Sequence, residues 1–462
     1  MTRPPESGHD EGTGRQPAPG LADGLWRRRS VGHGLGALAL SEGTARVAQV
    51  VTLMVLARRL GADGMGVVGA AWSLYAIFLP WVQGAPELVG LREIGRRPKR
   101  LSIVGEISLV KVLLALAAVL FLLSFAWASY PPASPFARQI GLQAAVLLPV
   151  ALAVGWAFRG LQQVEVHAAL RAAQALALAL VLVLLLDREP LLVPAVEFAL
   201  YCLAACTGYG LLLWRARTTA EAPRVPWLLV ARAPRVLRRH GLAVVAQGTA
   251  GVAAAVTWHG CVPVASFFLS GAEIGNLTAA LRLLLVLNGS MLIGLQLFVP
   301  MLARSHERGS DAASGATARL AGYAIVAGGS TAALVGLAAE PICVLLFGKE
   351  LGSGSAPLVS ALAWGLLPAS VGSVYSYTLV AARRDVAVSA CMCAGAVFSL
   401  VVAPLAFAFV DGASALFFVP AAIALQTTGL AIYAHASGLI AWVSPSARWL
   451  WPGEIRRFME SR

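Results

Sequence analysis

The sequence predicts an all-α, polytopic membrane protein: twelve transmembrane helices in two six-helix lobes, related by a pseudo-two-fold axis along the membrane normal. Its composition is the first reason. The 462-residue chain is 58% hydrophobic and only 13% charged, with a mean hydropathy of +0.74, whereas soluble domains carry about 25% charged residues. A soluble globule of this size cannot bury so much apolar surface.

The second reason is the length of the apolar segments, since about 20 residues cross a hydrocarbon core. Twelve helices are expected near residues 33–57, 66–90, 103–130, 138–158, 164–186, 191–214, 240–268, 273–302, 318–346, 356–382, 386–410 and 413–441. The longest polar connection lies midway and separates six helices from six. No connection is long enough for a soluble catalytic domain.

These segments divide the chain into five parts. A disordered, basic cytoplasmic tail is expected at 1–30 and an N-terminal lobe at 31–214. A cytoplasmic linker follows at 215–239, then a C-terminal lobe at 240–441 and a cytoplasmic interfacial tail at 442–462. Three arginines before the first apolar segment resemble the start of a signal peptide. However, Glu42 and Arg46 interrupt that segment and no Ala-x-Ala cleavage site follows, so the helix is predicted to be retained.

Positive charge gives the orientation, because Lys and Arg gather in cytoplasmic loops. With the N-terminus inside, 27 of the 36 Lys and Arg residues fall in cytoplasmic segments, five outside and four within helices. This alternation supports an inner (cytoplasmic) membrane protein with both termini in the cytoplasm. The formal net charge of +13 is thus assigned to loops, and no nucleic-acid partner is expected.

A weak internal repeat supports the two lobes. Residues 60–74 (LGADGMGVVGAAWSL) align without gaps to residues 269–283 (LSGAEIGNLTAALRL), with identity at five positions that include Gly66 and Gly275. Both copies mark the turn from the first to the second helix of a six-helix half. Two halves of like orientation favour a transport path between them; chance similarity of Gly/Ala-rich helices is the alternative.

Ionisable residues inside predicted helices are the candidate functional groups, because burying an Arg in a bilayer costs about 2.5–3.5 kcal/mol on insertion scales. Glu42, Arg46 and Gln49 share one helical face at i, i+4 and i+7. Arg46 is predicted to line a cavity and attract an anionic headgroup while Glu42 holds its side chain; a self-neutralising structural pair is the alternative. Arg282 has no acidic neighbour at i±3 or i±4, so it is expected to face water or a partner on another helix.

Weaker candidates complete the set. Lys111 and Arg171 lie about two turns from the cytoplasmic surface, where either substrate binding or snorkelling accounts for them. Glu197, Glu340 and His259 are candidates for ion coupling, although Glu340 lies near the outer rim and His259 also suits a hydrogen bond between helices. The six cysteines all lie in apolar segments without zinc-ligand spacing. No metal site, catalytic residue or cofactor is expected.

Two motifs resemble a known family. Residues 56–77 (LARRLGADGMGVVGAAWSLYAI), followed by LREIGRR at 91–97, are similar to the first quarter of the polysaccharide transporter (Wzx-type) flippases of the multidrug/oligosaccharidyl-lipid/polysaccharide (MOP) superfamily. Residues 274–304 are similar to the second-half motif, with Arg282 on its arginine position. The resemblance covers about residues 30–445.

This resemblance implies the MOP flippase fold and a function. Undecaprenyl-diphosphate-linked oligosaccharide would pass from the inner to the outer leaflet by alternating access around a cationic cavity. The implied partners are that substrate, membrane lipids, a coupling H⁺ or Na⁺ ion and polysaccharide polymerase machinery. One departure bears on coupling: family members often carry an acidic residue in helix 7, where this chain reads VTWHGCVPVASFF (256–268). Either His259 takes the place of that residue or coupling lies elsewhere in the chain.

Three alternatives stay open. A drug or cation antiporter of the MATE type needs buried carboxylates in its path, whereas the unpaired candidates here are arginines. A lipid II flippase of the same superfamily usually has two additional helices. A membrane-embedded glycosyl- or acyltransferase needs a DxD or a His-x-x-x-Asp motif, and the sequence has neither; the protein is therefore not expected to be an enzyme.

Overall fold

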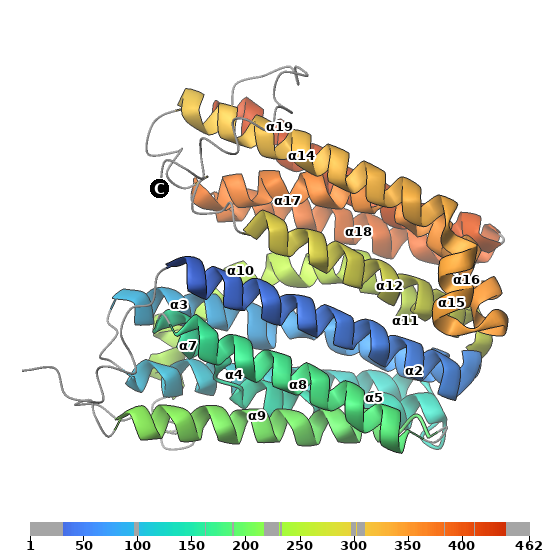
Figure 1. Ribbon diagram of the computed structural model, residues 1–462, viewed down its shortest axis with the longest axis horizontal. Coiled ribbons are helices and arrows are strands. Elements are labelled where there is room, and N and C mark those ends of the chain that lie inside the picture. The colour runs from blue at the N-terminus through green and yellow to red at the C-terminus, as the bar shows by residue number, and fades with distance from the viewer. Residues whose placement is uncertain are drawn as a thin grey trace, which may run out of the picture.

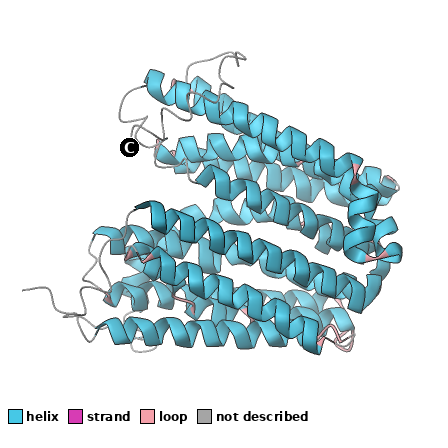
Figure 2. Ribbon diagram, viewed as in Figure 1, coloured by secondary structure: helices cyan, strands magenta, loops and turns pink. Residues whose placement is uncertain are grey.

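The computed structural model describes residues 31–96, 101–161, 163–186, 189–216, 231, 233–296, 302, 310–382, 384–410 and 412–439. The predicted tails at 1–30 and 442–462 lie outside these residues, as does most of the predicted linker. Every regular element among the described residues is a helix (Figure 2). The all-helical prediction is therefore confirmed for this part of the chain.

The helices of the first half are α2 (Val31–Leu79), η1 (Pro80–Gly84), α3 (Ala85–Arg96), α4 (Ser102–Ser129), α5 (Pro135–Ala145), α6 (Leu147–Leu152), α7 (Gly155–Gly160), α8 (Val164–Leu185) and α9 (Leu192–Ala216). Those of the second half are α10 (Ala233–His259), α11 (Cys261–Ala265), α12 (Gly271–Gln296), α14 (Ser310–Leu337), α15 (Ala339–Phe347), α16 (Lys349–Ala363), α17 (Leu366–Ala381), α18 (Asp385–Phe409), η3 (Gly412–Phe417) and α19 (Phe418–Ala436). Figure 1 shows the blue-to-green helices on one side of the bundle and the yellow-to-red helices on the other.

Nine helices in the described part are long and apolar enough to cross a membrane, or eleven if each of two bent pairs counts as one span. The protein is therefore a multi-pass membrane protein. The predicted count of twelve and the pseudo-two-fold relation between whole lobes stay predictions.

The first candidate span, Leu40–Ile94, has 55 residues, far more than the roughly 20 that one crossing needs. Gly61 interrupts α2 with a φ of 66° and a ψ of −170°, a conformation open to glycine because it has no Cβ. The start of α2 and α3 lie at the same end of the bundle (Figure 1), so the chain reverses at Gly61. We call residues 31–60 the first arm of α2 and residues 62–79 its second arm.

The two copies of the internal repeat pack against each other. A Cβ built on Gly66 would overlap the carbonyl of Gly271, and one built on Gly275 would overlap that of Ala62. The repeat alignment makes Ala62 equivalent to Gly271 and Gly66 equivalent to Gly275, so the two contacts are reciprocal. A two-fold relation between the segments produces this pattern, and small residues four apart permit such close helix packing.

Arg58 and Arg59 join the end of the first arm to two other helices. Arg58 donates to the carbonyl oxygens of Leu345 (2.6 Å) and Leu346 (3.2 Å) near the end of α15. Arg59 donates to those of Leu186 (2.8 Å) and Val183 (3.3 Å) at the end of α8. Carbonyls in the last turn of a helix lack intrahelical partners and attract cations, so this pair caps one helix in each half of the chain.

Most predicted boundaries agree with the helices to within a few residues. The helices predicted from 240 and from 356 begin seven residues earlier, at Ala233 and Lys349, and two further regions differ. The predicted loop at 58–65 is helical except for the reversal at Gly61. The predicted helix at 318–346 instead begins at Ser310 and is broken at Ala338 (φ −99°, ψ 20°), between α14 and α15. The break at Ala338 lies inside an apolar segment, where hydropathy alone carries no signal of a turn, whereas the reversal at Gly61 falls within the predicted loop.

Candidate substrate cavity

A cavity of about 500 Å³ lies among the helices and is lined by polar and apolar side chains. Its ionisable members are Arg46, Glu87, Arg159, Arg171, Glu197 and Arg282, with His167 and His259. The lining comes from both arms of α2 and from η1, α3, α7, α8, α9, α10 and α12. Only His259, Arg282, Leu285 and Val286 belong to the second half of the chain, so the cavity lies mainly within the first half rather than midway between the halves.

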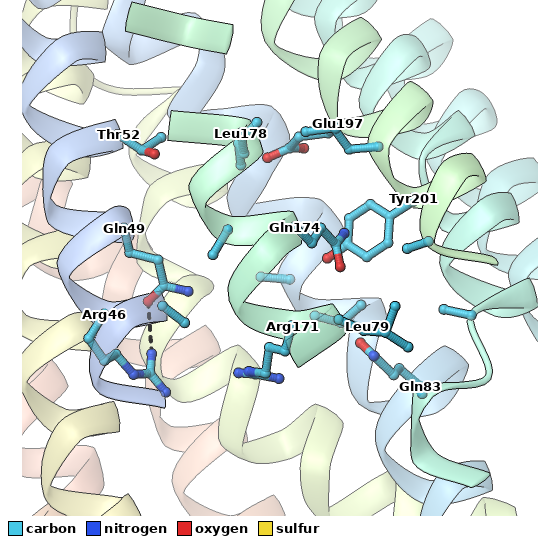
Figure 3. A pocket seen from close by; sticks show the side chains of 18 of the residues that line it. Arg46, Gln49, Thr52, Leu79, Gln83, Arg171, Gln174, Leu178, Glu197 and Tyr201 are labelled. Atoms are coloured by element: carbon cyan, nitrogen blue, oxygen red, sulfur yellow. Dashed lines mark hydrogen bonds between the residues drawn. The ribbon is translucent and has the colours of Figure 1, made fainter. Parts of the chain in front are cut away.

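Helical spacing places the polar groups on two facing stripes. In the first arm of α2, Glu42, Arg46 and Gln49 follow one another at i, i+4 and i+7; in α8, His167, Arg171 and Gln174 have the same spacing. Residues at these intervals lie on one face of a helix. Figure 3 shows Arg46 and Arg171 extending toward each other from the two helices.

Glu42 connects the two stripes. Its carboxylate lies 2.8 Å from Nε of Arg171 and 3.9 Å from a terminal guanidinium nitrogen of Arg46. Arg46 donates to Oε1 of Gln49 at 2.9 Å (Figure 3), while its Nε is buried without a hydrogen-bond partner among the described residues. The predicted Glu42–Arg46 pair is therefore the looser of two contacts, and the carboxylate binds mainly the arginine of α8.

Arg282 of α12 is placed by an aromatic ring rather than by a carboxylate. Its guanidinium carbon lies 4.1 Å from the ring centroid of Trp72, a cation–π distance. Among the described residues no carboxylate lies within ion-pair distance of it. The indole N–H of the same Trp72 donates to both oxygens of Glu197 (3.1 and 3.3 Å), and Gln143 donates to Oε2 of Glu197 at 2.6 Å.

Lys111 does not line the cavity, contrary to its prediction as a substrate-binding residue. The side chain is fully buried, and its ammonium donates to Glu87 at 3.1 Å and to the carbonyl oxygen of Ala153 at 2.9 Å. Arg159 contacts the other oxygen of Glu87 at 3.3 Å. The lysine neither snorkels to the surface nor faces the cavity, because a glutamate distant in sequence neutralises it inside the bundle.

The three candidates for ion coupling have different locations. Glu197 and His259 line the cavity, and Nδ1 of His259 is buried without a hydrogen-bond partner in the described structure. Glu340 is exposed in the first turn of α15 and does not line the cavity. Among the described residues no group of three or more His, Cys, Asp or Glu side chains is arranged to hold a metal ion.

The charges of the lining favour an anionic ligand. Four arginines face two glutamates, so the formal charge is +2 with both histidines neutral. Both glutamates already accept hydrogen bonds, Glu87 from Lys111 and Arg159, and Glu197 from Trp72 and Gln143. The arginine side chains of Arg171, Arg159 and Arg46 keep 42%, 38% and 23% of their surface exposed. Arginine N–H groups that can bind a further acceptor therefore outnumber the lining carboxylates that lack a hydrogen-bond donor.

Several lining residues were not identified from the sequence, among them Gln174, Tyr201, Trp72 and His167. The signal for two of them was present, because His167, Arg171 and Gln174 repeat the spacing that singled out Glu42, Arg46 and Gln49. Tyr201 lies one helical turn after Glu197 on α9 and points into the same cavity (Figure 3). No sequence pattern indicated that Trp72, an aromatic residue in an apolar helix, would face the cavity.

The buried Lys111–Glu87 pair leads to a stability prediction. Glu87→Gln should destabilise the protein by about 3 kcal/mol or more, because it leaves a buried ammonium without its carboxylate. Lys111→Met should cost less, since Glu87 keeps Arg159, and the double variant should be more stable than Glu87→Gln alone. Thermal unfolding of the three purified variants in one detergent gives the order. A Glu87→Gln variant as stable as the wild type would rule out this role for the pair.

Solved structures of similar architecture cover most of the chain. A multidrug resistance MATE family transporter of the MOP superfamily, in an inward-facing conformation, matches 87% of this chain and 97% of its own with a TM-score of 0.63 and 12% identity. The lipid II flippase MurJ, in an inward closed conformation, matches 87% of this chain and 88% of its own with a TM-score of 0.66 and 10% identity. The chain has the fold of the MOP superfamily transporters.

A third similar structure is a MOP superfamily transporter from Pyrococcus furiosus, described as having a binding pocket of reverse polarity; it matches 88% of this chain and 97% of its own with a TM-score of 0.54 and 10% identity. No protein-family model and no curated protein matches the sequence. These three similar structures are membrane transporters, one of them a flippase. At these identities the similarity extends to the fold alone.

Proposed function

We propose that this protein is a flippase that moves an undecaprenyl-diphosphate-linked oligosaccharide from the inner to the outer leaflet of the cytoplasmic membrane for surface polysaccharide synthesis. The excess of arginines over glutamates in the cavity lining supports this proposal most strongly. A diphosphate offers several acceptor oxygens and two or more negative charges, and guanidinium groups bind such oxygens in fork geometry. Arg46, Arg171 and Arg282 are the proposed headgroup ligands.

The size of the cavity suits a headgroup rather than a whole lipid. Ligand pockets of about 300–1,000 Å³ hold drug-sized molecules, and about 500 Å³ leaves no room for a long polyprenyl chain beside a saccharide. The lipid tail is therefore proposed to stay in the bilayer while the headgroup enters the cavity. Alternating access of the two lobes then carries the headgroup across, with Glu197 and His259 as the proposed positions for a coupling H⁺ or Na⁺.

A MATE-like drug or cation antiporter is the second candidate, and one observation favours it: Glu197 is a carboxylate in the cavity wall, and a cationic drug would be drawn to it. Its two oxygens, however, already accept three hydrogen-bond contacts from Trp72 and Gln143. A cation would also meet four arginines in the cavity lining. The charge balance therefore favours the flippase over the antiporter.

The proposal is tested in cells that lack this protein. The lipid-linked saccharide pool is extracted and divided by leaflet with a membrane-impermeant probe, and cells complemented with the wild-type chain are the control. Intermediates should accumulate on the cytoplasmic side and surface polysaccharide should disappear. An unchanged pool together with increased drug sensitivity would contradict the flippase and support the antiporter.

A further inference from the structure

Glu42 occupies a place that an anionic ligand would need. Its carboxylate lies between Arg171 of α8, at 2.8 Å, and Arg46 of α2, at 3.9 Å. Both arginines line the cavity, whereas Glu42 does not. Only 13% of the Glu42 side-chain surface is exposed, so the carboxylate is largely shielded from solvent while it contacts two arginines of the cavity lining.

The two arginines differ in how firmly they are held. Arg46 has a neutral acceptor in Gln49 at 2.9 Å, and its guanidinium lies against the backbone of Gly289, where a Cβ would come within 2.8 Å of it. Arg171 has Glu42 as its one ion-pair partner among the described residues and keeps 42% of its side-chain surface exposed. Arg171 is therefore the arginine that is free to exchange one acceptor for another.

We infer that Glu42 is a resident counter-ion of the anion site, which the substrate's phosphate oxygens displace from Arg171 and Arg46 and which returns to these arginines when the substrate leaves. This role rests on the proposal that the cavity receives an anionic headgroup. Without a competing carboxylate, two guanidiniums facing a low-dielectric cavity would bind a diphosphate tightly in both orientations of the transporter. A built-in competitor lowers that affinity and makes release possible.

The inferred role predicts opposite changes in binding and in transport. A purely structural Glu42 would hold the arginines in place, so removing its charge would weaken binding and transport together. A resident counter-ion competes with the ligand, so removing its charge strengthens binding while slowing release. The two roles are thus separated by the sign of the change in affinity.

The experiment measures binding of inorganic pyrophosphate to the full-length chain in lipid nanodiscs by calorimetry. Glu42→Gln should bind pyrophosphate roughly tenfold more tightly than the wild type, because a charge-assisted competing bond is lost. Arg171→Gln and Arg46→Gln should each bind it at least tenfold more weakly. Glu340→Gln is the matched control, since it removes the same charge from an exposed site outside the cavity and should leave the affinity unchanged.

Glu42→Ala is the second variant, in case the amide of Glu42→Gln disturbs folding, and monodispersity on size exclusion is required of each. If the arginine variants lose binding while both Glu42 variants bind as the wild type does or more weakly, the counter-ion role is overturned and the cationic cavity stands. If the wild type itself binds no pyrophosphate, the anionic-headgroup function fails, and the role of Glu42 fails with it.

Discussion

Replacement of both Arg46 and Arg282 by glutamine should reduce substrate flipping at least a hundredfold while the protein stays folded in the membrane. Each arginine is expected to supply a charge-assisted hydrogen bond worth about 1.5–3 kcal/mol to the diphosphate, and about 1.4 kcal/mol corresponds to a factor of ten. The two residues line the same cavity from helices of different halves, α2 and α12. The losses of binding free energy from the two substitutions should therefore add when one substrate molecule binds.

Two controls make this result specific for charge in the cavity. The Arg138→Gln/Arg384→Gln double variant removes two exposed charges outside the cavity and should flip substrate at the wild-type rate. The Arg46→Lys/Arg282→Lys double variant keeps both charges without the guanidinium fork and should lie between the wild type and the glutamine variant. If the glutamine double variant flips substrate at the wild-type rate, the proposed role of the two arginines is contradicted.

Gly275→Leu should prevent correct packing of α12 against the second arm of α2 and markedly lower the yield of folded protein. Even the smallest side chain is excluded here, because a Cβ on Gly275 would come within 2.7 Å of the carbonyl carbon of Ala62. Gly275→Ala should therefore cost about 1–3 kcal/mol, the usual range for overpacking. Thermal unfolding of the purified protein in detergent measures the loss.

Gly322→Ala is the matched control, since this glycine is also helical and a Cβ there would meet no atom within 4 Å. It should be as stable as the wild type. Gly66→Ala, the reciprocal position, should be destabilised like Gly275→Ala, and the double variant should lose less than the sum because both changes separate the same two helices. Equal stability of Gly275→Ala and Gly322→Ala would contradict the close packing of the two repeat copies.

Much of the fold was predictable because bilayer physics constrains it strongly. A backbone in hydrocarbon must satisfy its own hydrogen bonds, so a long apolar segment is read as a helix with little ambiguity. The reversal at Gly61 lies within the loop predicted at 58–65, where Arg58, Arg59 and Asp63 interrupt the apolar sequence; that the backbone on both sides of this glycine is helical was not predicted. The break at Ala338 was missed, because it lies inside an apolar segment and leaves no trace in hydropathy.

The candidate site was predictable in part. Arg46, Arg282, Arg171, Gln49, Glu197 and His259 all line one cavity, and each was singled out because a polar group in an apolar helix requires a reason. Their roles in binding or coupling stay predictions. Lys111 met the same criterion but is neutralised by Glu87, 24 positions away in the sequence, and pairing between helices cannot be read from the spacing within one helix.

The contacts between helices at the site could also not be predicted from the sequence. Glu42 was expected to hold Arg46, four residues away on the same helix, yet its shorter contact is to Arg171 on α8. Trp72 joins Glu197 to Arg282 through an N–H donor and a ring face. Such contacts depend on how helices pack, which the polar stripes of single helices do not determine.

The most direct measurement of the central claim is flipping by the purified chain in proteoliposomes. A polyprenyl-diphosphate-linked saccharide is placed in the vesicles, and the fraction reached by an impermeant enzyme or reagent is followed in time. The wild type should expose substrate from both leaflets far faster than vesicles containing the Arg46→Gln/Arg282→Gln variant, and excess pyrophosphate should slow it. A wild-type rate equal to that of protein-free vesicles would contradict the claim that this cavity carries a lipid-linked diphosphate across the membrane.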